Sequence, residues 1–326
     1  MRRRLLHVVI AILGVGVGLF ALEMWVRWSH PEVRDQVVPR GLVSLDGDLG
    51  WKLTPNAEGV HRSTYFTVAY VINSSGFRDE PRTVTRAVGV NRTLLYGDSQ
   101  IFGWGVPANE RFSNRLESDH REIWNLAVPG YGLDQEILSY RRDGRGFDAD
   151  DVIFFVSRVT LERLHASYVY RKYKPRFVLS ANGELTFEPI PKVGLGPTGF
   201  LYRVLGPFYL PYYLERRLAD PLAPVGSSEF GGLAKRLLLE ARSLATQARE
   251  RVTVLSDLPL PERSRVRDFC SRNDMGFLEV ALENRSGLFV ISRDDRHWNG
   301  EAHAVIAEQL AKQLEAEAVE SPAAHR

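Results

Sequence analysis

The chain has 326 residues, 44% of them hydrophobic and 25% charged, and its 42 basic side chains nearly balance 40 acidic ones. This composition indicates a globular protein of one large or two modest domains, and a net charge of +2 gives no reason to expect nucleic acid as a partner. The one cysteine, Cys270, excludes a disulfide within the chain, and with no CxxC pattern or nearby histidine we expect it to be a structural thiol.

Residues 1–28 predict an N-terminal signal anchor. Three arginines at positions 2–4 precede an apolar span from Leu5 to Val26, close to the roughly twenty residues that a membrane-spanning helix needs. Because basic residues stay in the cytoplasm, the rest of the chain is expected on the far side of an inner membrane, periplasmic or otherwise extracytoplasmic. A cleaved signal peptide is the alternative, but no A-x-A-like site follows the apolar span, which favours an uncleaved anchor.

Residues 29–90 are expected to form a β-containing lead-in that packs on the main domain. The stretch YFTVAYVI, residues 65–72, is rich in β-branched and aromatic side chains and runs into the turn cluster NSSG, residues 73–76. This pattern is typical of a strand that ends in a turn.

From residue 91 to 316 the pattern changes to strands that alternate with helices. Five short apolar runs without polar alternation predict strands buried on both faces of a parallel sheet; they are residues 92–96, 123–128, 151–156, 251–257 and 276–280. Residues 232–250 and 302–314 place apolar side chains at helical spacing. An open α/β sheet follows from this alternation.

The segment 161–230 interrupts the alternation and is interpreted as an insertion. Ala181-Asn182-Gly183 lies between two strand-like runs and predicts a hairpin, and residues 202–213 are rich in aromatic side chains and proline. The insertion could cap the active face, shape substrate access or lie near the membrane; simple packing is the alternative. Residues 317–326 form a polar tail.

The stretch RTLLYGDSQIFGWG contains the first candidate catalytic residue. Ser99 follows a predicted strand and comes directly after the sharp turn Gly97-Asp98. Such a serine is either ordinary turn chemistry or a nucleophile exposed to substrate. Near the C-terminus, SRDDRHWNG carries His297 just before a predicted helix, with Asp294 three residues upstream. An Asp so placed can accept the Nδ1 hydrogen of the histidine, which leaves Nε2 to take a proton from a serine hydroxyl.

These motifs together resemble the SGNH (GDSL-type) serine esterases, over about residues 92–157 and 251–314. The resemblance implies a flavodoxin-like three-layer α/β/α fold with a central parallel sheet. It also implies Ser99 as nucleophile, His297 as base and Asp294 as its orienting acid. The amides of Ser99 and of Gly130, in the glycine loop NLAVPGYG, are implied as donors of the oxyanion hole.

The sequence departs from that family at one place. The third block normally ends its strand with an asparagine that completes the oxyanion hole, whereas here DVIFFV runs into SRVTLERL. Loss of one such donor typically costs ~10²–10³ in rate unless another group replaces it. Arg158 or Thr160 is the candidate replacement.

We therefore predict a membrane-anchored serine esterase acting on acyl esters, with O-acetyl groups of an envelope or exported polysaccharide as the substrate that family and location suggest. An acyltransferase on the same scaffold and a catalytically weakened glycan-binding or assembly subunit are the alternatives. No cofactor is expected. Without HExxH, CxxC, Walker or dinucleotide-binding patterns, no metal site is expected either.

Overall fold

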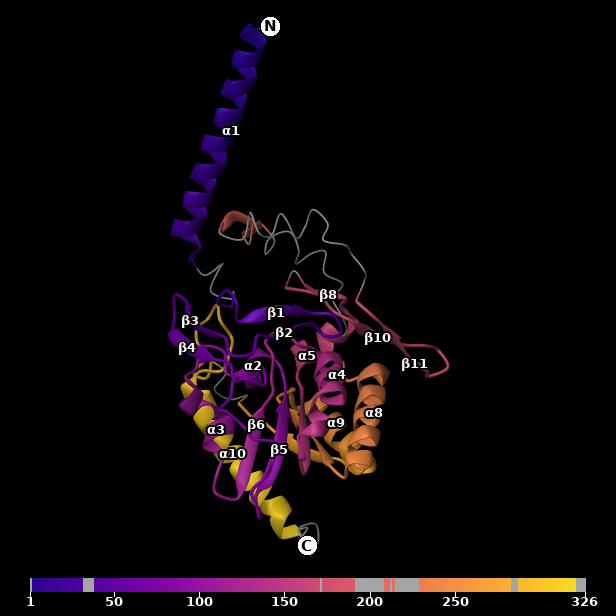
Figure 1. Cartoon of the computed structure of the whole chain (residues 1–326). Helices are drawn as coiled ribbons and strands as arrows, with labels where there is room; N and C mark the ends of the chain where they lie inside the picture. Colours follow the sequence, from indigo (N-terminus) through magenta and orange to yellow (C-terminus); the bar gives the residue numbers. More distant parts are fainter. Residues whose placement is uncertain are drawn as a thin grey trace. The chain divides into compact units, whose positions relative to one another are not determined.

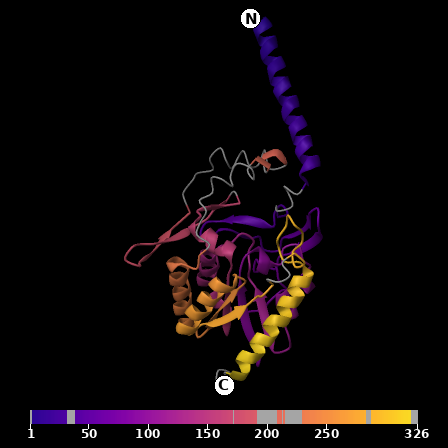
Figure 2. The same cartoon turned by 180° about the vertical axis from the view of Figure 1, so that it is seen from behind.

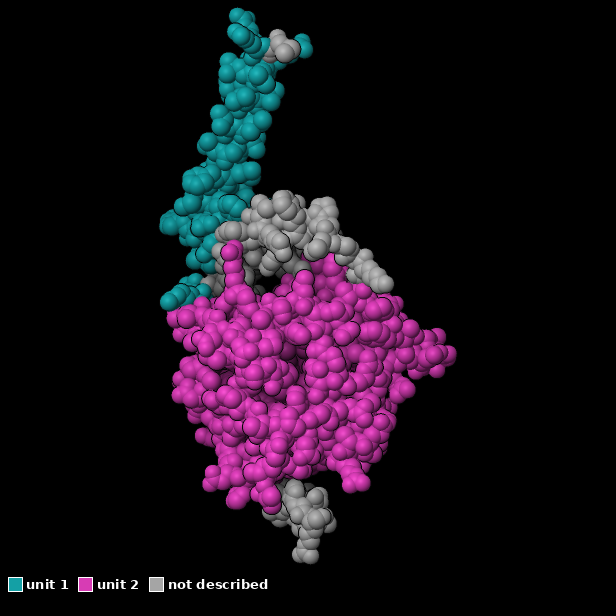
Figure 3. Space-filling model, in the orientation of Figure 1, with its two compact units in different colours: residues 1–37, 62–66, 192–224 teal, residues 38–61, 67–191, 225–326 magenta. Residues whose placement is uncertain are grey.

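The computed structural model describes residues 2–31, 38–170, 172–190, 208–211, 213–214, 229–282 and 287–320, the side chains of 317–320 excepted. The chain divides into two compact units, which are described separately (Figure 3). Unit 1 comprises residues 1–37, 62–66 and 192–224, and unit 2 comprises residues 38–61, 67–191 and 225–326.

Unit 1 contains α1 (Arg2–Ser29), a 28-residue helix with a mean hydropathy of 2.6 over its most apolar window. Its apolar side chains are exposed along most of its length, as the side chains of a helix surrounded by lipid would be. The helix is long and apolar enough to span a membrane, a property that an N-terminal signal sequence shares.

The core of unit 2 is a five-stranded parallel sheet in the order β13-β12-β7-β5-β6 (Figure 1). The strands are β5 (Asn91–Tyr96), β6 (Arg121–Asn125), β7 (Asp151–Val156), β12 (Arg251–Ser256) and β13 (Gly276–Glu279). All five lie where continuous apolar runs predict them, because strands covered on both faces need apolar side chains in both directions. The predicted α/β fold class is confirmed.

Helices cover both faces of this sheet. One layer contains α4 (Leu133–Arg142), α8 (Gly232–Ala248) and α9 (Leu260–Arg272), and the other contains α3 (Phe112–Arg115) and α10 (Gly300–Glu320). Figures 1 and 2 show the orange helices α8 and α9 on the opposite side of the sheet from the yellow α10. In chain order the strands run 2-1-3-4-5 across the sheet, so the order reverses between β5 and β7. Open α/β sheets bind ligands at such a switch point, beyond the carboxyl ends of the strands.

The lead-in supplies two pairs of short strands, β1 (Val43–Asp46) with β2 (Gly50–Leu53) and β3 (Glu58–Arg62) with β4 (Thr67–Val71). The first pair approaches the small hairpin of β8 (Tyr168–Val169) and β9 (Lys172–Tyr173) closely. Gly50 has φ +89°, and a Cβ there would lie 2.4 Å from the Tyr173 carbonyl oxygen. Only glycine permits this approach, which places the lead-in beside the hairpin.

The predicted hairpin in the insertion is present as β10 (Arg176–Leu179) and β11 (Leu185–Glu188), with Gly183 at φ +83° in its turn. Of the predicted aromatic stretch 202–213, residues 202–207 and 212 lie outside the described residues. Cys270 is fully buried in α9, and burial raises the pKa of its thiol to about 12, as befits a structural thiol.

Candidate active site

Ser99 lies on a tight turn at the carboxyl end of β5. The strand order of the sheet reverses between β5 and its neighbour β7, so this turn lies at the switch point. The turn leads directly into α2 (Ser99–Phe102), whose N-cap is Asp98; the Asp98 carboxylate accepts a hydrogen bond from the Gln100 amide at 2.9 Å. A Cβ on Gly97 would lie 2.2 Å from Cγ1 of Ile101, so the turn requires glycine there. Local sequence thus fixes the serine at the switch point of the sheet.

His297 joins Ser99 through a direct hydrogen bond. The Ser99 hydroxyl lies 2.8 Å from Nε2 of His297, and Nδ1 of the same ring lies 2.6 Å from Oδ1 of Asp295. A carboxylate can only accept, so Nδ1 carries the hydrogen and Nε2 is left to accept the hydrogen of the Ser99 hydroxyl. The sequence separation of 198 residues between serine and histidine is closed by the β5 turn and the loop before α10.

The structure corrects the predicted acid partner, because Asp295 rather than Asp294 holds the histidine. Asp295 is 3% exposed and its Oδ1 also accepts the His297 backbone amide at 3.2 Å. Asp294 is exposed, on a turn in which Ser292 accepts from both aspartate amides. That turn reverses the chain, so the carboxylate two residues before the histidine points inward and the one three residues before points outward.

Two further side chains support His297. The Gln100 side chain accepts from the Trp298 amide at 2.8 Å and donates to the Arg296 carbonyl at 3.3 Å, so it holds the backbone on both sides of the histidine. The Trp104 indole stacks on the imidazole, with ring centroids 5.2 Å apart and an interplanar angle of 25°. Neither role was predicted, since neither a glutamine after the serine nor a nearby tryptophan is diagnostic without a partner in space.

Electrostatics favour the ionised form of Asp295. Burial raises its pKa, but the hydrogen bonds and charge of His297, with the Trp104 indole, outweigh it, so the pKa lies below the usual range. Oδ2 of Asp295 and Nε1 of Trp104 are both buried and have no hydrogen-bond partner within the described residues. The carboxylate is therefore suited to stabilise a positively charged imidazolium.

The backbone amides of Ser99 and Gly130 are the predicted donors of the oxyanion hole. Within the described residues neither amide donates to a protein acceptor. Gly130 has φ +91°, and a Cβ there would lie 3.0 Å from the Tyr170 ring and 3.1 Å from the Trp51 ring. A glycine is thus required both by the backbone conformation and by the two aromatic rings against it.

The structure argues against both predicted replacements for the missing asparagine. Arg158, at the start of α5 (Arg158–Glu162), is exposed and pairs with Glu162 at 2.9 Å. The Thr160 hydroxyl is fully buried, accepts from the Ser157 amide at 2.9 Å and lies 3.2 Å from the Phe155 carbonyl. Its one hydrogen is used within this capping turn, so it has none to offer a substrate.

Two other features lie outside this cluster. His303 on α10 is fully buried, stacks on Phe112 and accepts the Phe112 amide; burial, reinforced by Arg111, lowers its pKa to about 3. It packs as an uncharged core residue. In the described parts of the chain, no group of three or more His, Cys, Asp or Glu side chains is placed to hold a metal ion.

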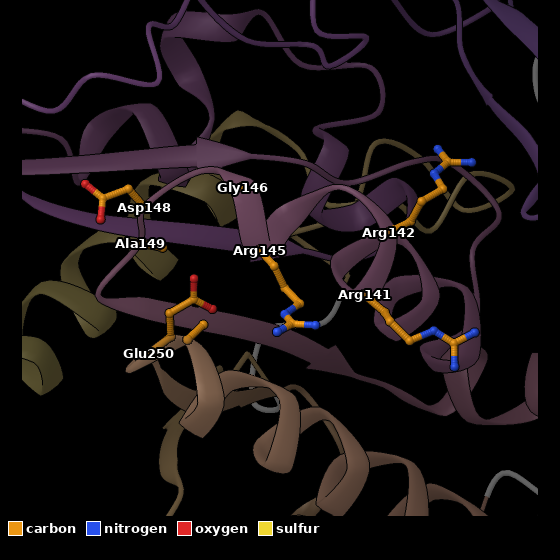
Figure 4. Close-up of a pocket in the computed structure, with 8 residues that line it drawn as sticks. Arg141, Arg142, Arg145, Gly146, Asp148, Ala149 and Glu250 are labelled. Atoms are coloured by element: carbon orange, nitrogen blue, oxygen red, sulfur yellow. The ribbon is translucent and has the colours of Figure 1, made fainter.

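A surface hollow lies at the amino-terminal edge of the sheet, away from Ser99 (Figure 4). Its Ala149 and Glu250 precede β7 and β12, whereas Ser99 follows β5. A six-residue strand of roughly 20 Å separates these two edges. The side chains drawn in Figure 4 do not converge on one point, so this hollow is not part of the candidate active site.

No model of a known protein family matches the chain, and no curated protein matches it significantly. Solved structures with a related chain path include a candidate acylhydrolase from Bacteroides fragilis, with 12% identity over 72% of this chain and 90% of that chain at a TM-score of 0.42. A GDSL-like lipase from Bacteroides thetaiotaomicron shows 11% identity over 70% and 89% of the two chains at a TM-score of 0.36. The lipase/acylhydrolase from Enterococcus faecalis shows 9% identity over 70% and 97% at a TM-score of 0.36.

Proposed function

We propose that this protein is a membrane-anchored serine esterase that hydrolyses small acyl esters. The observation that carries the proposal is the continuous hydrogen-bonded series from the Ser99 hydroxyl through His297 to Asp295, at 2.8 and 2.6 Å. The unpartnered amides of Ser99 and Gly130 add a place for the developing oxyanion.

The geometry supports a two-step acyl transfer. Ser99 Oγ forms a bond to the ester carbonyl carbon while its proton passes to Nε2 of His297, and the carbonyl oxygen becomes an oxyanion held by the two amides. Collapse breaks the carbon–oxygen bond to the alcohol, which takes the proton from Nε2. Water then attacks the acyl-enzyme and loses its proton to Nε2 of His297. Collapse of this second intermediate breaks the bond between the carbonyl carbon and Ser99 Oγ, which takes the proton back from His297 as the carboxylic acid leaves.

O-acetyl groups on an envelope or exported polysaccharide are the substrate we favour. This choice rests on the proposed location, because a domain anchored on the outer side of an inner membrane meets such polymers. The active form is the uncleaved one in this proposal.

Contacts of α1 within unit 1 support retention of the anchor. The Glu23 carboxylate is 5% exposed and accepts the amides of Tyr209 and Leu210 at 2.8–3.0 Å. Arg27 pairs with Glu23 at 2.6 Å and lies over the Tyr209 ring. In the uncleaved chain these contacts hold the C-terminal part of α1 against Tyr209 and Leu210.

The test is hydrolysis of p-nitrophenyl acetate by the full chain purified in detergent, together with labelling by a fluorophosphonate probe. Ser99→Ala should abolish labelling and reduce turnover to near background, and His297→Ala should lower kcat by at least ~10⁴. A wild-type chain that neither turns over acetyl esters nor labels at Ser99 would refute the esterase proposal. Acetylated and deacetylated polysaccharides then test the substrate class.

A further inference from the structure

The oxyanion hole of the proposed esterase has two backbone donors, and the turn after β7 provides no third one. Thr160 uses its hydroxyl inside the α5 cap, and Arg158 points to solvent where it pairs with Glu162. The resemblance noted in the sequence leads us to expect an asparagine amide here. A third donor to the oxyanion hole would therefore come from a segment other than the turn after β7.

Arg163 connects the two segments that carry the backbone donors. Its side chain is 8% exposed, and its Nη1 donates to the Asp98 carboxylate at 3.0 Å and to the Tyr131 carbonyl at 2.8 Å. Asp98 precedes Ser99 and Tyr131 follows Gly130, so this one nitrogen ties the two amide-bearing turns together. The guanidinium therefore lies between the turn that carries Ser99 and the turn that carries Gly130.

The other terminal nitrogen of Arg163 holds the hydroxyl of Tyr170. Nη2 donates to Tyr170 Oη at 3.0 Å, and a guanidinium has no acceptor. The phenol must therefore direct its own hydrogen elsewhere, and among the described residues it finds no protein acceptor. Charge-assisted acceptance from Arg163 also polarises the phenol and strengthens it as a donor.

Tyr170 also covers the second oxyanion residue. Its Cδ2 and Cε2 lie 3.0 and 3.2 Å from the position of a Cβ on Gly130, yet the residue as a whole is 56% exposed. The residue occupies the turn between β8 and β9 with φ +46°, a conformation that bulky residues rarely adopt. Strained backbone of this kind is found where the surrounding structure fixes a side chain for function.

We propose that the Tyr170 hydroxyl, held by Arg163, is the third donor of the oxyanion hole and takes over the task of the missing asparagine. The inference rests on the proposed esterase function of the same site. In the tetrahedral intermediate the phenolic O–H donates to the oxyanion beside the amides of Ser99 and Gly130, while Arg163 continues to donate to the phenol oxygen. Arg163 is then a positioning residue and Tyr170 a catalytic one.

The test compares Tyr170→Phe with Tyr173→Phe, which removes a hydroxyl from the same hairpin where the ring packs on Tyr168. With p-nitrophenyl acetate and the full chain, Tyr170→Phe should lower kcat by ~10²–10³ while KM changes less than about threefold, because the bond forms only in the transition state. A trifluoromethyl ketone, which forms a tetrahedral adduct with serine, should lose affinity by a similar factor. Tyr173→Phe should match the wild type in all three measurements.

Rates are expressed per Ser99 labelled by fluorophosphonate at the end point, so that partial unfolding of a variant does not imitate a catalytic loss. If Tyr170→Phe keeps wild-type kcat and ketone affinity while Ser99→Ala is inactive, the role of Tyr170 is overturned and the esterase proposal stands. A rise in KM with unchanged kcat would equally overturn it, because it would make Tyr170 a ground-state binding residue. If the wild type neither reacts nor labels, both proposals fall together.

Discussion

At the scale of single residues, the candidate site depends on which of two adjacent aspartates in the turn before His297 faces inward. Asp295 and Asp294 are neighbours of identical chemistry, yet only Asp295 is buried against Nδ1 of His297. Trp104 restricts the imidazole from a third side through ring stacking. The tautomer and orientation of His297 are therefore set by side chains whose own positions the turn determines.

Asp295→Asn should lower kcat by about 10⁴. An amide at this position can stabilise the wrong tautomer of His297, and it carries no negative charge to stabilise the imidazolium. Asp294→Asn is the matched control and should stay within about twofold of the wild type. Both are measured as p-nitrophenyl acetate turnover per labelled Ser99. Equal losses in the two variants would contradict the assignment of Asp295.

Asp257, which follows β12 at the same edge of the sheet, gives stability a pH dependence. Burial, reinforced by the charge of Asp98, raises its pKa to about 7 from the ordinary 3.8. Between about pH 4 and 7 the folded protein keeps a proton that the unfolded chain has released, so stability falls as pH rises through this window. Asp257→Asn removes this loss.

The variant should therefore gain stability relative to the wild type from pH 4 to pH 7, by at most about 4 kcal/mol, and the gain should be level above pH 7. Urea unfolding of the full chain in detergent at several pH values measures the difference. Asp268→Asn, an exposed change on α9, is the control and should give no such trend. A pH-independent difference for Asp257→Asn would show that its carboxyl titrates alike in both states.

At the scale of elements, the turn between β7 and α5 caps the N-terminus of α5. Ser157 and Thr160 satisfy each other's backbone amides, at 3.1 Å and 2.9 Å, in a capping box buried beside the site. The same turn follows β7, the strand next to the switch point. Its polar side chains therefore stabilise the helix and leave the substrate side to other elements.

Thr160→Val should destabilise the fold by about 1–3 kcal/mol, because it leaves the buried Ser157 amide without its acceptor. Its kcat per labelled Ser99 should remain within a few-fold of the wild type. Arg158→Ala should change neither quantity measurably, since exposed ion pairs contribute little. A hundredfold fall in kcat for Arg158→Ala at unchanged stability would return that residue to the oxyanion hole.

At the scale of the whole molecule, the chain combines an apolar N-terminal helix with an α/β unit that contains the complete candidate site. Ser99, Gly130, Arg163, Tyr170, Asp295 and His297 all belong to unit 2. The helix that is long enough to span a membrane and the side chains of the candidate site thus belong to different units. Removing the attachment should therefore release the protein without changing its active-site groups.

We expect the full chain with tags at both ends to stay in the membrane pellet after carbonate extraction, with both tags on one polypeptide. Deletion of residues 2–28 should move the protein to the soluble fraction. Immunoblots of the two fractions measure this outcome. Loss of the N-terminal tag from a pelleted or secreted product would contradict the uncleaved anchor.

The sequence alone determined the architecture of unit 2, because a strand buried on both faces or an amphipathic helix requires a pattern of neighbouring residues that can be read locally. It also placed Ser99 and His297 on the turns where the structure brings them into contact. Asp295 was missed in favour of Asp294, since one reversal of the chain decides which of two adjacent carboxylates faces inward. Arg163, 65 residues from Asp98, and Gln100, 198 residues from Trp298, acquire their roles only through tertiary contacts. Hydrogen bonds between distant segments depend on distances and angles that no local pattern encodes, and the fold alone decided them.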